Sequence, residues 1–146
     1  MSISDDSLLL KNQVCFPLYA ASRILIQAYR EPLEELGLTY PQYLVMLILW
    51  EKDGLTVSQI GEKLFLDSGT LTPVLKRLEA NNFIKRNRSD KDERKVEIEL
   101  TYPGKSLQAK ATPIPEKIHS LLNQWEEGEL SLFKIQVNKL IETLKH

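Results

Sequence analysis

Two short amphipathic segments separated by about four residues limit most strongly what this chain can fold into. They lie in the stretch LTVSQIGEKLFLDSGTLTPVLKRLEANNFIKR, residues 55–86. Thr56 or Ser58 can cap a first helix, and Asp67 or Ser68 can cap a second. The apolar positions that recur at helical spacing in the two segments are Val57, Ile60, Leu64, Leu71, Val74, Leu75 and Leu78. The pattern predicts a helix-turn-helix.

The segment that follows predicts a β-hairpin. FIKRNRSDKDERKVEIEL, residues 83–100, alternates on both sides of a polar, charged centre, as two antiparallel strands do. A helix-turn-helix followed by a hairpin is a winged helix. We therefore expect a mainly α fold with a small β-hairpin wing, and a DNA-binding core from about residue 40 to residue 100.

Two apolar helices are expected before this core. Residues 8–30 carry closely spaced apolar side chains and few charges, which indicates a helix buried on more than one face. Pro17 is expected to kink that helix or to start a new segment, because proline has no N–H and clashes with the preceding turn. Thr39 is the expected cap of a second helix, YPQYLVMLILWE, that ends near Lys52.

The chain from about Pro103 onward is also helical in composition, with interruptions at Pro113, Pro115 and Gly128. A chain of 146 residues is about the size of one domain, so we expect residues 1–146 to form a single winged-helix domain. The end helices, about 8–36 and 103–146, have no obvious partner inside a domain this small. We expect them to bury one another across a homodimer.

The charges give a local signal that the total conceals. The net charge is −1, but residues 76–96 hold eight basic and four acidic side chains, a sum of +4. No apolar run approaches the roughly 18 residues that span a bilayer, and the start, MSISDDSLLL, is acidic where a secretory signal is basic. We expect a cytoplasmic protein that makes no membrane contact.

The second helix of the predicted motif has the composition of a DNA-reading helix. Such a helix enters the major groove by its N-terminal end. Here that end carries the short hydroxyl side chains of Ser68, Thr70 and Thr72, and Lys76 and Arg77 follow one to two turns later. Pro73 has an ordinary explanation, because proline is tolerated in the first turn of a helix.

The tip of the expected hairpin supplies further positive charge. Its basic residues are Arg86, Arg88, Lys91, Arg94 and Lys95. A thin charged loop beside a recognition helix is suited to a neighbouring minor groove. A charged run by itself more often indicates a solvated face, but its position after a helix-turn-helix favours binding to double-stranded DNA at a pseudo-palindromic operator.

These residues resemble a known family. Four segments are similar to those of the MarR family of dimeric winged-helix regulators, and especially to the one-cysteine form of its organic hydroperoxide-sensing branch. They are QVCFPLYAASR, LTYPQYLVMLILWE, LDSGTLTPVLKRLE and DKDER. The resemblance covers about residues 8–110. It implies a repressor of an oxidative stress response. It also implies that Arg94 enters the minor groove while Asp92 steadies it.

Cys15 is the only cysteine, so it cannot form a disulfide within the chain. A thiolate, not a thiol, attacks a peroxide, so a sensing cysteine needs a lowered pKa. If Pro17 restarts the helix, Cys15 lies just before a helix N-terminus, where free N–H groups favour an anion. Tyr19, four residues on, can share its face.

The resemblance adds two thiolate-stabilising residues, Tyr29 and Tyr40, which in that branch come from the partner subunit. Without a second cysteine, a sulfenic acid on Cys15 is expected to form a mixed disulfide with a small cellular thiol or to overoxidise. The organic hydroperoxide is then the oxidant. The chain would release its operator after oxidation.

Other functions are open at this point. A free cysteine in an apolar helix is often an inert packing residue, and a MarR-type repressor can instead be released by a small aromatic ligand. A thiol peroxidase needs a recycling system, so we expect no enzyme. The two histidines, His119 and His146, lie in no metal-ligand pattern, and no phosphate-binding loop is present, so we expect no metal and no cofactor.

Overall fold

The computed structural model describes residues 5–92 and 94–145. The chain divides into two compact units, of which one ends at Ile114 and the other begins at Pro115. In chain order the elements are η1 (Asp5–Leu8), η2 (Leu10–Asn12), α1 (Cys15–Glu34), α2 (Tyr40–Glu51), β1 (Leu55–Thr56), α3 (Val57–Leu64), α4 (Ser68–Ala80), β2 (Ile84–Arg88), β3 (Val96–Leu100), α5 (Tyr102–Ala111), α6 (Pro113–Ser120) and α7 (Glu129–Leu144).

Helix α2 is the centre of the first unit. Its start follows the prediction, because the backbone N–H of Thr39 donates to Oε1 of Gln42 over 3.0 Å, half of a capping box. Val45 and Met46 are fully buried, and Leu49 is 1% exposed. Leu47, however, is 40% exposed, so the apolar residues of α2 are buried on most of the helix but not on every side.

The helix-turn-helix has the predicted caps. Oγ1 of Thr56 accepts from the N–H of Gln59 over 3.2 Å at the start of α3, and Oδ1 of Asp67 accepts from the N–H of Thr70 over 2.7 Å at the start of α4. Helix α3 ends at Phe65, whose φ of 56° is left-handed and turns the chain toward α4. The apolar side chains that α4 buries are Leu71, Leu75 and Leu78.

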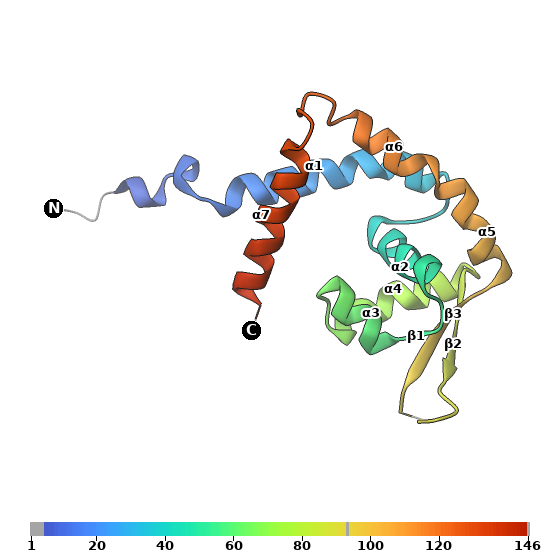
Figure 1. Ribbon diagram of the computed structural model, residues 1–146. Coiled ribbons are helices and arrows are strands. Elements are labelled where there is room, and N and C mark those ends of the chain that lie inside the picture. Colours follow the sequence, from blue (N-terminus) through green and yellow to red (C-terminus); the bar gives the residue numbers. More distant parts are fainter. Residues whose placement is uncertain (1–4, 93, 146) are drawn as a thin grey trace. The chain divides into compact units, whose positions relative to one another are not determined.

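The wing is an antiparallel pair, β2 and β3, whose register runs from Ile84 opposite Leu100 to Arg88 opposite Val96. In Figure 1 it extends as a two-stranded arm from the helices of the first unit. A third strand, β1, pairs with β3 through Leu55 and Ile98, so the sheet order is β1-β3-β2. The winged helix-turn-helix is thus confirmed, although a two-residue strand is too short to show alternation in the sequence.

Gly104 joins three parts of the first unit. Its carbonyl accepts from Nε1 of Trp50 in α2 over 2.9 Å, and its own N–H donates to Oγ1 of Thr101 over 3.1 Å. A Cβ at this position would lie 2.0 Å from the carbonyl oxygen of Phe83. Only glycine permits this approach, which packs the start of α5 against the turn before β2.

The predicted start of the first helix was wrong, because α1 begins at Cys15 and not near residue 8. The residue that α1 buries within the chain is Leu33, near its end. Tyr19 is 65% exposed and Ile24 is 60% exposed. Burial of these side chains across a homodimer stays a prediction, because a single chain does not test it.

Pro17 is the third residue of α1, where an N–H has no helical acceptor. Of the two alternatives for Pro17, the start of a new segment is the one observed, because η2 ends at Asn12 and α1 begins at Cys15. Pro73 differs from its prediction. Pro73 is the sixth residue of α4 and so lies beyond the first turn. It removes the helical hydrogen bond to the carbonyl of Gly69.

The second unit contains the rest of α6 and the predicted last helix, α7. The rings of Trp125 and Phe133 pack with centroids 5.4 Å apart. Several apolar side chains of α7 remain exposed: Leu132, Phe133, Ile135, Leu140 and Leu144. None of the helices within the described residues is long and apolar enough to cross a membrane.

Candidate DNA interface and thiol site

The N-terminal end of α4 presents its hydroxyl side chains unequally. Ser68 and Thr70 are exposed, whereas Thr72 is partly buried. Oγ1 of Thr72 donates to the carbonyl oxygen of Ser68 over 2.6 Å. A hydroxyl has a single proton, so Thr72 offers a neighbouring group only an acceptor oxygen and a methyl group. Lys76 and Arg77, one to two turns on, are exposed.

Hydrogen bonds between residues close in sequence restrain the tip of the wing. The N–H of Ser89 donates to the carbonyl of Lys95 over 2.8 Å, and the N–H of Lys95 donates to that of Asp92 over 2.9 Å. The N–H of Arg94 donates to Oδ1 of Asp92 over 3.0 Å, and Nε of Arg94 lies 3.5 Å from the same oxygen. The Arg94 side chain is 93% exposed, so a held backbone presents a projecting guanidinium.

A cleft of about 470 Å³ separates the wing from the helices. Arg86, Arg94 and Lys95 line it from the wing, together with Ser68 and Thr72 from α4 and Thr56 from the start of α3. Hydroxyl and cationic side chains thus meet at one surface. Groups of these kinds supply most protein contacts to the DNA backbone.

Arg86 does not lie at the hairpin tip, contrary to the sequence interpretation. It is the middle residue of β2, opposite Ile98. Its Nη2 donates to Oε1 of Glu79 in α4 over 3.0 Å. The sequence reasoning did not single out Glu79, and the only signal was its place in the last turn of α4, seven residues before a basic strand residue.

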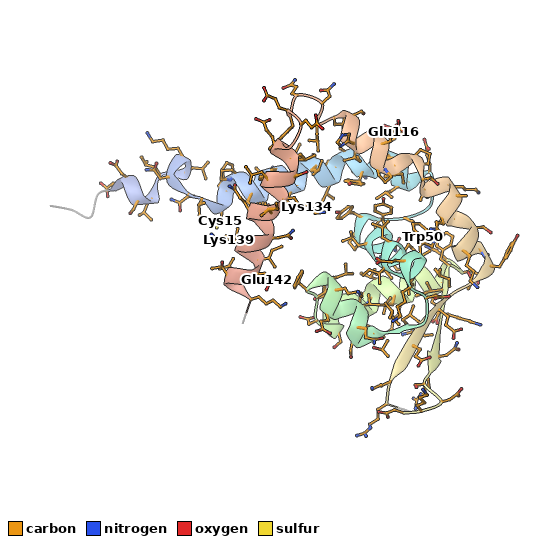
Figure 2. The ribbon with its side chains drawn as sticks, in the orientation of Figure 1. Cys15, Trp50, Glu116, Lys134, Lys139 and Glu142 are labelled. Atoms are coloured by element: carbon orange, nitrogen blue, oxygen red, sulfur yellow. The ribbon has the colours of Figure 1, made fainter. Side chains whose placement is uncertain are left out.

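Cys15 is the first residue of α1 and its side chain is exposed. Figure 2 shows it at the start of that helix, well apart from Trp50 in α2. Tyr19 lies on the next turn, and the guanidinium of Arg23 lies 5.8 Å from the centroid of its ring. The tyrosine expected to share a face with the thiol therefore stacks with an arginine of its own helix.

Tyr29 and Tyr40 lie in contact, with ring centroids 4.9 Å apart. A third tyrosine, Tyr43, completes the cluster at 5.9 Å from Tyr29 and 6.3 Å from Tyr40. Burial raises the pKa of all three phenols above the ordinary 10.0, and the neighbouring phenols raise the pKa of Tyr29 further. The cluster therefore keeps its O–H protons at neutral pH, as hydrogen-bond donors to an anion must.

The sequence reasoning missed Tyr43. The available signal was its position three residues after Tyr40, on the same face of α2.

The chain does not bring its own thiol to this cluster. Fourteen residues of one continuous helix separate Cys15 from Tyr29, which at about 1.5 Å per residue is about 21 Å. A hydrogen bond spans about 3 Å. If these tyrosines act on a cysteine, it is one from another copy of the chain.

The ionisable side chains form no candidate metal centre: residues 5–92 and 94–145 hold no group of three or more metal-ligand side chains close enough to bind an ion.

Comparisons with known proteins identify transcriptional regulators as relatives of this chain. A family model described as "Transcriptional regulator SarA/Rot" matches residues 27–111. The organic hydroperoxide resistance transcriptional regulator of Bacillus subtilis (strain 168) is 50% identical over 139 residues, which cover 95% of this chain and 94% of that protein.

Solved structures give the same result. Reduced AbfR bound to DNA matches with a TM-score of 0.81 at 42% identity, over 97% of this chain and 96% of that one; AbfR comes from Staphylococcus epidermidis. The crystal structure of MarR matches with a TM-score of 0.70 at 26% identity, over 88% of this chain and 97% of that one.

Proposed function

The chain belongs to the SarA/Rot family of transcriptional regulators, among the MarR-like winged-helix proteins, and we propose that it is a DNA-binding repressor that senses organic hydroperoxides. Oxidation of Cys15 releases it from its operator. It acts as a cytoplasmic homodimer and is not an enzyme.

One observation carries the DNA-binding part: the capped end of α4 and the projecting wing arginine line the same cleft. Helix α4 enters the major groove, and Arg94 enters the minor groove beside it while Asp92 restrains its direction. The DNA-binding side chains are Ser68, Thr70, Thr72, Lys76, Arg77, Asp92, Arg94 and Lys95. A homodimer places two such surfaces about one helical turn apart on a pseudo-palindromic operator.

The sensing part requires two chains at each thiol. The phenols of Tyr29 and Tyr40 of one protomer hydrogen-bond the Cys15 thiolate of the other, because their own Cys15 is about 21 Å away. The position of Cys15 at the first residue of α1 adds the free N–H groups of a helix start. Both features favour the thiolate, which is the reactive form.

The chemistry is a two-electron oxidation of sulfur. The thiolate attacks the outer oxygen of the hydroperoxide, the O–O bond breaks, and after proton uptake the products are a sulfenic acid and an alcohol. A small cellular thiol then attacks the sulfenic sulfur, which forms a mixed disulfide and releases water. The added group cannot fit where a thiolate was held between two chains, and the strain repositions the DNA-reading helices.

The test compares the wild type with Cys15→Ser by fluorescence anisotropy on a duplex from the gene's own upstream region. Each protein receives one equivalent of an organic hydroperoxide with a small thiol present. We expect both reduced proteins to bind and only the wild type to be released. Retention of the oxidised wild type on DNA would contradict the sensing mechanism.

A second function is favoured by a hollow of about 420 Å³ beside the tyrosines, lined by Ile26, Leu33, Leu38 and Tyr40 among others. A MarR-type repressor released by a small aromatic ligand could use it, with Cys15 structural. The same variant separates the two functions. If a ligand releases the repressor, Cys15→Ser responds to that ligand as fully as the wild type does. If oxidation of Cys15 releases it, Cys15→Ser does not respond to the hydroperoxide.

A further inference from the structure

One carboxylate of the recognition helix α4 binds the middle of strand β2, which we call the root of the wing. The backbone N–H of Arg86 donates to Oε2 of Glu79 over 3.1 Å, and Nη2 and Nε of the same arginine donate to Oε1 over 3.0 and 3.3 Å. These bonds lower the pKa of the Glu79 carboxyl. One strand residue thus binds both oxygens of one helix residue.

This pair differs from the other charged contacts of the wing. Its side chains are only 31% and 38% exposed, whereas that of Arg94 is 93% exposed. The neighbouring pair of Lys85 and Glu99, at 3.5 Å, joins only the two wing strands and does not touch α4. Charge-assisted, multiply bonded pairs restrict geometry more than single exposed ones.

The position of the pair makes it a hinge restraint. Helix α4 and β2 are otherwise linked along the chain by only three residues, 81–83. Arg86 lies opposite Ile98, and Arg94 precedes Ile98 by four residues, which is about 13 Å at the rise of a strand. A rotation of about 10° at the root would therefore move the tip by about 2 Å, enough to break a hydrogen bond.

We propose that Glu79 and Arg86 are positioning residues for DNA binding: their ion pair fixes the angle between the recognition helix and the wing, so that α4 and Arg94 engage adjacent grooves together. Arg86 lines the same cleft as Arg94, but its guanidinium is bound to Glu79, so the pair acts by holding Arg94 in place. The inference rests on the proposed DNA binding and not on the oxidation of Cys15.

The test uses the reduced, full-length protein on the upstream duplex, with no oxidant. The variants are Glu79→Gln, Arg86→Gln and the charge swap Glu79→Arg with Arg86→Glu, each made alone and in an Arg94→Ala background. Each single substitution should weaken binding about tenfold, as expected for a lost groove contact. The loss should fall below about twofold once Arg94 is absent, because coupled residues are not additive.

Two comparisons keep the result specific. The charge swap preserves the net charge and the pairing, so it should recover affinity to within about threefold of the wild type. Lys85→Gln removes one positive charge from the same strand and should change affinity by less than about threefold. A thermal melt of each variant before the titration, followed by circular dichroism, ensures that only folded protein is compared.

The proposal is overturned if Arg86→Gln weakens binding equally with and without Arg94, reduces the salt slope by about one, and is not rescued by the swap, since these are the marks of a direct phosphate contact. Unchanged affinity in every variant also overturns it. A wild type that fails to bind the duplex overturns the proposed function itself, together with this inference.

Discussion

The helix-turn-helix and its wing bury their apolar residues within one chain, whereas α1 and α7 leave theirs in contact with solvent. Ile60, Leu71 and Ile98 are fully buried, but Ile24 in α1 is 60% exposed and Ile135 in α7 is 63% exposed. A region with a closed core has a geometry of its own. In the proposed homodimer, a region without one takes its final geometry from the partner chain, which makes it a suitable place for a switch.

The largest effect expected from this difference concerns stability. Leu71→Ala should lower the free energy of unfolding by about 3 kcal/mol, because it leaves a cavity in the closed core. Ile24→Ala should instead raise the dimer dissociation constant by about tenfold. Denaturant unfolding followed by circular dichroism and sedimentation equilibrium measure the two quantities. An unchanged dimer dissociation constant for Ile24→Ala would contradict the claim that a partner chain covers α1.

The next effect concerns the thiol. Tyr40→Phe should slow the oxidation of Cys15 by an organic hydroperoxide about tenfold, because it removes one hydrogen bond to the thiolate, and a hydrogen bond to a charged group contributes about 1.5–3 kcal/mol. The DNA affinity of the reduced protein should not change. Stopped-flow kinetics measure the oxidation rate, and fluorescence anisotropy measures the affinity.

Mixed dimers sharpen that result. A dimer of one Cys15→Ser chain and one Tyr40→Phe chain contains one intact site if the tyrosine acts across the interface, because the remaining Cys15 meets the partner's unchanged tyrosine. It should oxidise at the wild-type rate per thiol. If the mixed dimer instead oxidises as slowly as the Tyr40→Phe homodimer, the tyrosine acts within its own chain.

The smallest effect concerns the N-terminal cap of α4, within the helix-turn-helix. The N–H of Thr70, which donates to Asp67, holds the pKa of that carboxyl below its ordinary 3.8. A lowered folded pKa means that the stabilisation is complete above the unfolded value and is lost as the pH falls through the folded one. Asp67→Asn keeps a cap without titration.

The advantage of the wild type over Asp67→Asn in melting temperature should therefore shrink between pH 6 and pH 3. The change should not depend on protein concentration, since the cap lies within one chain. A difference that is constant with pH would remove the ionised cap from the account of α4.

Local features were predictable because they depend on neighbours in sequence. Thr39 was identified as a cap, and Thr56 and Asp67 were each one of two candidates for a cap, since a cap bonds a backbone group three residues away. The wing followed from alternation in residues 83–100. Strand β1 was not predictable, because two residues carry no period and their pairing with β3 is decided more than forty residues later.

The site residues divide in the same way. The family resemblance pointed to Asp92 beside Arg94, and the structure shows that the two residues bond locally. The sequence interpretation placed Arg86 at the tip and passed over Glu79, because no local rule connects a helix end with the middle of the next strand. Tyr43 was also missed, because its role in the cluster depends on how α1 crosses α2.

Spacing along the chain was enough to predict the helices, the wing and the single thiol. It also gives the separation of about 21 Å between Cys15 and Tyr29, because both residues lie in α1. The cluster of three tyrosines and the pair of Glu79 and Arg86 could not be predicted in this way. They join different segments, and packing in three dimensions sets the distances between segments.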